Sequence, residues 1–102
     1  MSTLHTVNKS PFGNAALLSC LNHCKAGDAV LLIEDGVYGA IAGSALADAV
    51  KMGLNGVSLY ALEGDVNARG IDAGKIMGDV KTVDYGGFVD LVAEHDRTQS
   101  WL

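Results

Sequence analysis

The amino-acid sequence predicts an α/β fold in which helices cover both faces of a mostly parallel β-sheet. Two observations support this prediction. Short apolar segments alternate with helical ones along the chain, and one segment, 28–33, is apolar almost throughout, which is typical of a strand buried on both faces. Because crossovers between parallel strands are right-handed, the intervening helices fall on both sides of the sheet. The 102 residues suffice for one domain, so we expect a single domain over 1–102.

The first half of the chain is predicted to form two strands and two helices. Ser10 and Pro11 match an N-cap followed by proline in the first helical turn, and Gly27 is placed to end that helix. The second predicted helix is rich in Ala and Gly and ends before Gly53. The expected elements are a strand at 3–7, a helix at 10–25, a strand at 28–33 and a helix at 38–52.

The second half repeats the alternation. Asp84 is a suitable N-cap for a last helix, in which Phe88, Leu91, Val92 and His95 follow the i, i+3, i+4, i+7 spacing of one helical face. The expected elements are a strand at 57–62, a short helix or turn at 65–70, a strand at 79–83, the helix after Asp84, and an edge strand in the tail RTQSWL.

The composition is apolar for a small protein. Hydrophobic residues make up 49% of the chain and charged residues only 19%, and the mean hydropathy is +0.25. The longest apolar run, 29–33, is far shorter than the ~20 residues that span a bilayer, so we expect no membrane helix. We therefore expect other subunits to cover part of the apolar surface. With two cysteines and no apolar leader segment, the expected location is the cytoplasm and the expected thiols are free.

Charge and glycine pattern argue against nucleic-acid and nucleotide binding. The net charge is −5 and the seven basic residues are scattered, so we expect no direct contact with nucleic acid. Neither G-x-G-x-x-G nor G-x-x-x-x-G-K-[ST] occurs, and Gly36, Gly39 and Gly43 match neither motif. Glu34 and Asp35 also place carboxylates where a phosphate needs donors.

The two cysteines, Cys20 and Cys24, are four residues apart on one face of the predicted first helix. Leu17 and Leu21 share that face, so both thiols fit a role as small buried side chains. A disulfide on one helical face has poor geometry. Zinc could use Cys20, His23 and Cys24, but three nearby ligands in mid-helix fall short of a structural site, so we expect no metal and no other cofactor. A reactive Cys20 assisted by His23 stays open, whereas Cys24 faces the unfavourable end of the helix dipole.

Five other side chains could bear on function. His5 lies in the first strand and is expected to be structural. Trp101 is expected to pack on a partner or back on the sheet, because exposing it is costly. Lys9, Tyr38 and Arg69 follow strands and could line a cleft at the carboxyl ends of the sheet, or could be ordinary surface.

Four segments together resemble the DsrH/TusB family over almost the whole chain. They are LHTVNKSPF, GDAVLLIEDGVYGA, VSLYALEGDVNARGI and VDYGGFVDLVAEHDRTQSWL. The resemblance implies a three-layer α/β/α sandwich with a sheet of about five strands, which agrees with the prediction from the residues.

The resemblance also implies a function. Members of this family are the smallest of three related subunits in a cytoplasmic sulfur-relay complex, which passes sulfur as a persulfide between carrier proteins. The complex is a heterohexamer with two copies each of the DsrE, DsrF and DsrH subunits, or of TusD, TusC and TusB. Its sulfur-carrying cysteine lies on the DsrE or TusD subunit, and the acceptor is a DsrC/TusE-type protein. We therefore expect this chain to serve mainly in assembly and docking, as a non-catalytic or auxiliary subunit.

Only Cys20 is carried over as a candidate sulfur-handling residue. Members of the TusB type lack a cysteine in the first helix, so Cys20 makes this chain resemble DsrH of sulfur oxidisers. The leading expectation is a subunit of DsrEFH in dissimilatory sulfur oxidation, with Cys20 as an auxiliary persulfide site. The alternatives are a TusB-type subunit in tRNA 2-thiouridine synthesis, a purely structural subunit, and a sulfurtransferase in its own right. For Cys24 the resemblance implies no functional role.

Overall fold

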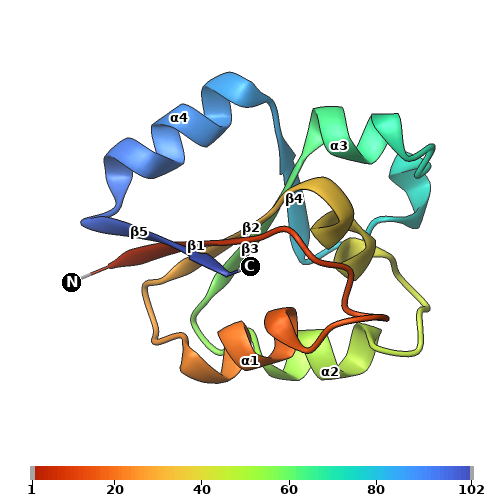
Figure 1. Ribbon diagram of the computed structural model, residues 1–102, viewed down its shortest axis with the longest axis horizontal. Coiled ribbons are helices and arrows are strands. Elements are labelled where there is room, and N and C mark those ends of the chain that lie inside the picture. The colour runs from red at the N-terminus through yellow and green to blue at the C-terminus, as the bar shows by residue number, and fades with distance from the viewer. Residues whose placement is uncertain (1, 102) are drawn as a thin grey trace.

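Five parallel strands form the central sheet in the order β4-β3-β2-β1-β5. The computed structural model describes residues 2–101, and Figure 1 shows the strands running through the middle of the molecule. Every strand pairs in parallel with its neighbours, which confirms the predicted sheet. The strands are β1 (Thr3–Val7), β2 (Ala29–Leu32), β3 (Ser58–Leu62), β4 (Val80–Val83) and β5 (Arg97–Trp101).

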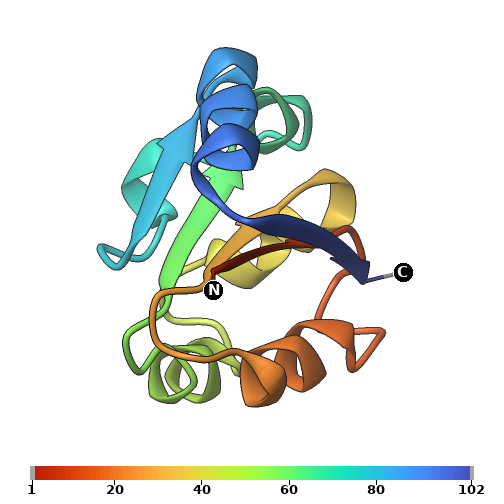
Figure 2. The same ribbon diagram turned by 90° about the vertical axis from the view of Figure 1, so that its left-hand side faces the viewer.

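Helices cover both faces of this sheet, as predicted. In Figures 1 and 2, α1 and α2 lie on one face and α3 and α4 on the other. The helices are α1 (Ala16–His23), α2 (Ala47–Met52), α3 (Glu63–Ala68) and α4 (Tyr85–Glu94), with the 3-10 helices η1 (Glu34–Ala40) and η2 (Ala73–Lys75). Within residues 2–101, none of these helices has the length and apolar character needed to cross a membrane.

The alternation of side chains along the central strands produces two cores. In β2, Val30 and Leu32 pack with the larger core toward α1 and α2, whereas Ala29 and Leu31 belong to the smaller core, which includes Leu91 of α4. All four β2 side chains are buried, which explains why this segment is a continuous apolar run.

Two predicted details of the C-terminal region are confirmed. The Asp84 carboxylate accepts a hydrogen bond of 2.8 Å from the Gly87 N–H and caps α4. The tail forms the edge strand β5, whose Trp101 lies opposite Val7 of β1. On α4, Leu91 faces the core as expected, but Val92 is largely exposed.

The prediction of a helix at 10–25 is wrong at its start. Ser10 and Pro11 begin a turn, in which the Gly13 N–H donates to the Ser10 carbonyl oxygen. The helix begins only at Ala16, whose N–H donates to the Asn14 side chain at 2.8 Å. Glycine and asparagine favour turns over a helix interior, which accounts for the late start.

The prediction of a helix at 38–52 is wrong over its first half. The chain there forms the end of η1 and then a loop, and only α2 is α-helical. Gly43 has φ of +74°, a left-handed conformation that interrupts a helix. The Ala42 N–H donates to the Lys75 carbonyl oxygen at 2.7 Å, so a distant segment supplies the backbone partner that a helix would have provided.

Candidate functional site

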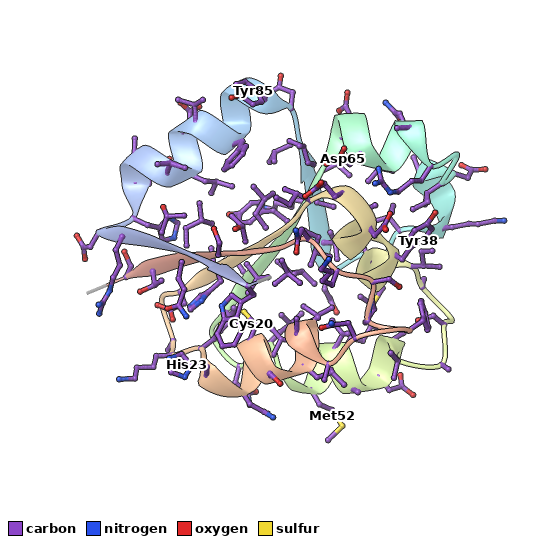
Figure 3. All side chains as sticks on the ribbon, viewed as in Figure 1. Cys20, His23, Tyr38, Met52, Asp65 and Tyr85 are labelled. Carbon is purple, nitrogen blue, oxygen red and sulfur yellow. The ribbon has the colours of Figure 1, made fainter. Side chains whose placement is uncertain are left out.

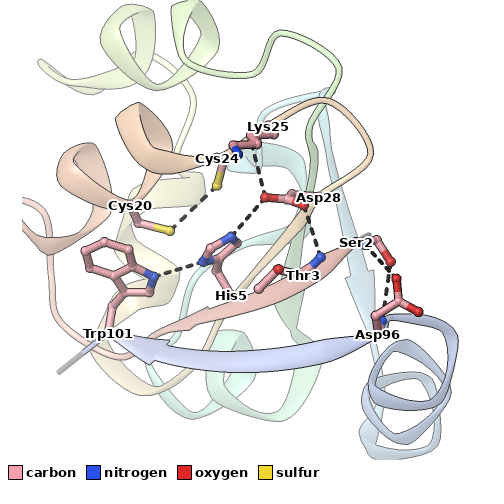
Figure 4. A network of polar contacts seen from close by, with 9 residues as sticks. All are labelled: Ser2, Thr3, His5, Cys20, Cys24, Lys25, Asp28, Asp96 and Trp101. Carbon is pink, nitrogen blue, oxygen red and sulfur yellow. Dashed lines mark hydrogen bonds and ion pairs between the residues drawn. The ribbon is translucent and has the colours of Figure 1, made fainter.

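A chain of hydrogen bonds links three side chains, which come from β5, from β1 and from the loop residue just before β2 (Figure 4). The indole Nε1–H of Trp101 donates to Nδ1 of His5 at 3.0 Å, and Nε2 of His5 lies 3.2 Å from Oδ2 of Asp28. An indole nitrogen can only donate, so Nδ1 of His5 carries no proton. The proton of the neutral imidazole is therefore on Nε2, which donates to Asp28.

Asp28 is buried, and both of its carboxylate oxygens accept hydrogen bonds. Its Oδ1 accepts from the Thr3 N–H at 3.0 Å, and its Oδ2 accepts from the Lys25 N–H at 3.1 Å as well as from His5. Burial by itself raises the pKa of Asp28, but the two backbone N–H groups and His5 outweigh it, so the pKa lies below its ordinary value. The carboxylate stays ionised and joins β1, the α1–β2 loop and β2.

Strand register brings these side chains together. His5 lies opposite Val30 of β2 and Gln99 of β5, and Trp101 is two residues beyond Gln99 on the same face. Trp101 therefore reaches back over the sheet to His5, which confirms that it packs on the sheet. His5 is almost fully buried and hydrogen-bonded at both ring nitrogens, which agrees with the expected structural histidine.

The two thiols lie at the end of α1, on the side that faces this chain of hydrogen bonds: Figure 4 shows both, and Figure 3 shows Cys20 between α1 and the sheet. Cys20 is completely buried on the core face of the helix, and Cys24 is the partly exposed C-cap with extended backbone. Their Sγ atoms are 3.9 Å apart, and both thiols are free. One ring nitrogen of His5 and the two Sγ atoms all lie within 4.8 Å of one another.

The shared hydrogen bond affects the two thiols in opposite ways. Together with burial, it raises the pKa of Cys20 far above its ordinary value. The same hydrogen bond lowers the pKa of Cys24, while burial and the Asp28 carboxylate act in the opposite direction. Cys20 is therefore a buried thiol with a raised pKa, so it lacks both features of a reactive thiol, exposure and a thiolate.

A cleft of about 430 Å³ opens beside the hydrogen-bonded chain. His23 stands in it, with its ring centroid 5.8 Å from that of Trp101 and 6.4 Å from that of His5. The cleft could admit a small ligand or a segment of another chain beside His5 and Asp28. The cleft is lined by Thr3, His5, His23, Lys25, Asp28, Arg97 and Gln99.

At the carboxyl ends of the strands, the structure shows how one of the three suggested side chains, Arg69, is held. Arg69 is held by ion pairs to Asp35 at 2.9 Å and to Asp65 at 3.6 Å. The 3-10 helix η1 follows β2, and a Cβ on its Gly36 would collide with the backbone of Val7 in β1. Arg69 therefore ties the end of α3 to η1, and a cleft that includes Lys9 and Tyr38 stays a prediction.

Sequence reasoning missed Asp28 as a member of the site and did not join His5 to the thiols. The contacts among these residues span 23 residues from His5 to Asp28 and 96 from His5 to Trp101. No local spacing records such contacts, because they depend on the order of strands in the sheet. The one available signal was a polar residue, Asp28, at the start of an otherwise apolar strand.

A second surface feature is the outer face of α4. Tyr85, Val89 and Val92 are exposed by 72%, 54% and 42%, although the same helix buries Leu91 against the sheet. Together with Phe88 and Ala93, the three exposed side chains line a shallow apolar hollow of about 320 Å³. We call these five residues the α4 face.

In a comparison with known proteins, residues 9–98 match a family model described as "DsrH like protein". The chain is 37% identical to Protein TusB of Pectobacterium parmentieri over 98 residues, covering 96% of this chain and 99% of the relative. It is 39% identical to Protein TusB of Klebsiella pneumoniae (strain 342) over 100 residues, with the same coverage.

Solved structures match the fold at lower sequence identity. The ychN protein from E. coli superposes with a TM-score of 0.79 at 15% identity, covering 98% of this chain and 99% of that one. A protein of unknown function from Methanobacterium thermoautotrophicum superposes with a TM-score of 0.73 at 18% identity, covering 97% and 96%. At these identities the likeness concerns the fold, and it agrees with the three-layer arrangement and the parallel five-stranded sheet.

Proposed function

The chain belongs to the DsrH-like family, and from that premise we propose that it is a subunit of a sulfur-relay complex whose main role is assembly and docking. The observation that carries the proposal is the match to TusB proteins over nearly the full length of both chains. The absence of an exposed thiolate at Cys20 supports a docking role over independent sulfurtransferase activity.

The proposed partners are DsrE- and DsrF-like subunits, or their TusD and TusC counterparts, in a heterohexamer with two copies of each chain. A DsrC/TusE-type protein is the proposed sulfur acceptor. The α4 face supports assembly, because three apolar side chains on one helix are exposed in a chain that is 49% hydrophobic. Covering such a face with another subunit removes apolar area from water and favours association.

Two pathways are compatible with such a complex. The relatives named TusB favour a TusB-type subunit in tRNA 2-thiouridine synthesis over the DsrEFH complex of sulfur oxidation that the sequence first suggested. The DsrEFH complex is kept as the second candidate because Cys20 lies in the first helix. The 2-thiouridine content of tRNA in a strain lacking the chain separates the two, since only the first predicts its loss.

Cys20 is proposed as no more than an auxiliary sulfur site. Its side chain has no exposed surface, and its Sγ lies 3.9 Å from that of Cys24, within hydrogen-bond distance for sulfur. A purely structural subunit, in which both thiols serve packing alone, is the alternative for this residue.

Co-purification of the tagged chain with its candidate partners tests the assembly role. We expect DsrE- and DsrF-like subunits to co-elute in equal amounts, and Val89→Asp to reduce their recovery at least tenfold. Asp90→Ala is the matched control, because Asp90 is also exposed on α4 but does not belong to the α4 face. A chain that elutes alone, with both variants unchanged, would contradict the proposal.

A further inference from the structure

We propose that His5, Cys20 and Cys24 form a binding site for a thiophilic d10 cation, the class that contains Zn²⁺ and Cu⁺. Soft thiolate sulfur together with imidazole nitrogen is the ligand set that such ions prefer. The sequence argued against a metal on the spacing of Cys20, His23 and Cys24. The structure assembles a different set, because His5 reaches the thiols from β1.

The distances between the candidate ligand atoms fit one ion. Two sulfurs bound tetrahedrally at about 2.3 Å from zinc are roughly 3.8 Å apart. The Sγ atoms of Cys20 and Cys24 are already 3.9 Å apart, and one of the two His5 ring nitrogens lies within 4.8 Å of both. Cys24 lies beyond the last turn of α1 with extended backbone, so its side chain is not confined to a helical rotamer.

The surroundings of His5 match those of metal-binding histidines. Such a histidine commonly donates its second ring N–H to a carboxylate, which fixes the ring and raises the basicity of the ligating nitrogen. Here Nε2–H donates to the buried Asp28 carboxylate, which leaves Nδ1 with its lone pair. The Trp101 indole N–H uses that lone pair at 3.0 Å, so a cation that binds Nδ1 must displace the indole.

For Zn²⁺, binding is balanced in charge at the ligands themselves, whereas Cu⁺ with the same two thiolates leaves one negative charge. The two thiols bind as thiolates and release two protons to solvent as one divalent ion enters, while neutral His5 changes no proton. Lys25 and Arg97 line the cleft together with the Asp28 carboxylate, so the negative charge near the ion comes from the two thiolates and from Asp28. Three protein ligands leave a fourth position for water or for a ligand that enters through the cleft.

The site does not rest on the proposed sulfur-relay function, because it depends only on the placement of three side chains. A bound cation does exclude one part of that function, because a cation on both sulfurs prevents a persulfide on Cys20. Metal binding and sulfur loading are therefore measured separately, and either can fail without the other.

Titration of the full-length chain with Co²⁺ under reducing, anaerobic conditions tests the site. We expect one equivalent to produce sulfur-to-cobalt charge-transfer absorption, and Zn²⁺ to abolish that absorption. Copper(I) is assayed in parallel by competition with a chromophoric chelator, which distinguishes the two ions of the class. If neither ion binds at micromolar concentration, the proposal is wrong.

Variants identify the ligands. Cys24→Ala removes a partly exposed side chain at a helix end, so the fold should persist, and we expect affinity to fall at least about a hundredfold. Trp101→Phe removes the competing indole and should tighten binding about fivefold. His23→Ala is the matched control, because it keeps all three proposed ligands and should bind normally. Binding that survives Cys24→Ala, or that disappears in His23→Ala, would overturn the assignment.

Discussion

Replacing Asp28 by asparagine tests whether the hydrogen-bonded chain at the site also holds the fold together. Asparagine has the same shape, but one of its two terminal atoms is an N–H₂ donor, whereas all three partners of Asp28 are donors. In its best orientation, the amide oxygen faces His5 and Lys25, and the amide nitrogen faces the Thr3 N–H. One hydrogen bond is lost, and the two that remain lose the charge of the carboxylate.

The expected cost follows from these three contacts. Two donors brought face to face in a buried site cost about 2 kcal/mol, and each bond that changes from charged to neutral loses about 1 kcal/mol. The sum, about 4 kcal/mol, is a large part of the ~5–15 kcal/mol that stabilises a domain of this size. With a urea dependence of about 1.5 kcal/mol per molar, the unfolding midpoint should fall by roughly 2–3 M.

Urea unfolding followed by circular dichroism measures the difference in unfolding free energy between the parent and Asp28→Asn. The buffer contains chelator and reductant so that no metal contributes. Asp79→Asn is the matched control, because Asp79 is exposed and lies in a turn, and its unfolding free energy should stay within about 0.5 kcal/mol of the parent. A loss below about 1 kcal/mol for Asp28→Asn would refute the reasoning, because it would show that the three donors are satisfied without the carboxylate.

Three further predictions concern stability and can be measured by thermal or urea unfolding. Cys20→Ser should cost about 1–3 kcal/mol, because it puts a hydroxyl into an apolar core, and Cys24→Ser should cost less than about 1 kcal/mol; equal losses would argue against their different burial. Gly36→Ala should cost about 3 kcal/mol because its Cβ meets the backbone of β1, whereas Gly64→Ala, in open space, should be neutral or stabilising; a harmless Gly36→Ala would contradict that contact. Trp101→Phe should cost about 1 kcal/mol through the lost indole hydrogen bond, and an unchanged midpoint would show that this bond contributes little.

Elements with strong local signals could be predicted from the sequence. β1 has the expected bounds, and α4 begins after the expected cap, because an apolar run and a capping aspartate act over a few residues. The segment 38–46 could not be predicted in this way. Its alanine-rich composition favours a helix, but its backbone pairs with Lys75 and Met77 from a later part of the chain.

The candidate site shows the same division between local and distant contacts. The spacing of Cys20 and Cys24 places both thiols on one side of α1, and the structure agrees. The addition of His5, Asp28 and Trp101 depends on β1 lying between β2 and β5, which no short motif records. Only the folded sheet shows that the thiols face an oriented imidazole.

Transfer of sulfur through the reconstituted complex tests the central proposal most directly. A DsrE/TusD-type subunit is loaded from a persulfide donor and mixed with a DsrC/TusE-type acceptor, with or without this chain, and intact mass spectrometry follows the added sulfur on every protein. We predict that sulfur reaches the acceptor efficiently only when this chain is present, and that Cys20→Ser leaves most of the transfer intact. Equal transfer without the chain would contradict a role in the relay. Transfer abolished by Cys20→Ser would make Cys20 an essential sulfur carrier and would contradict the docking role.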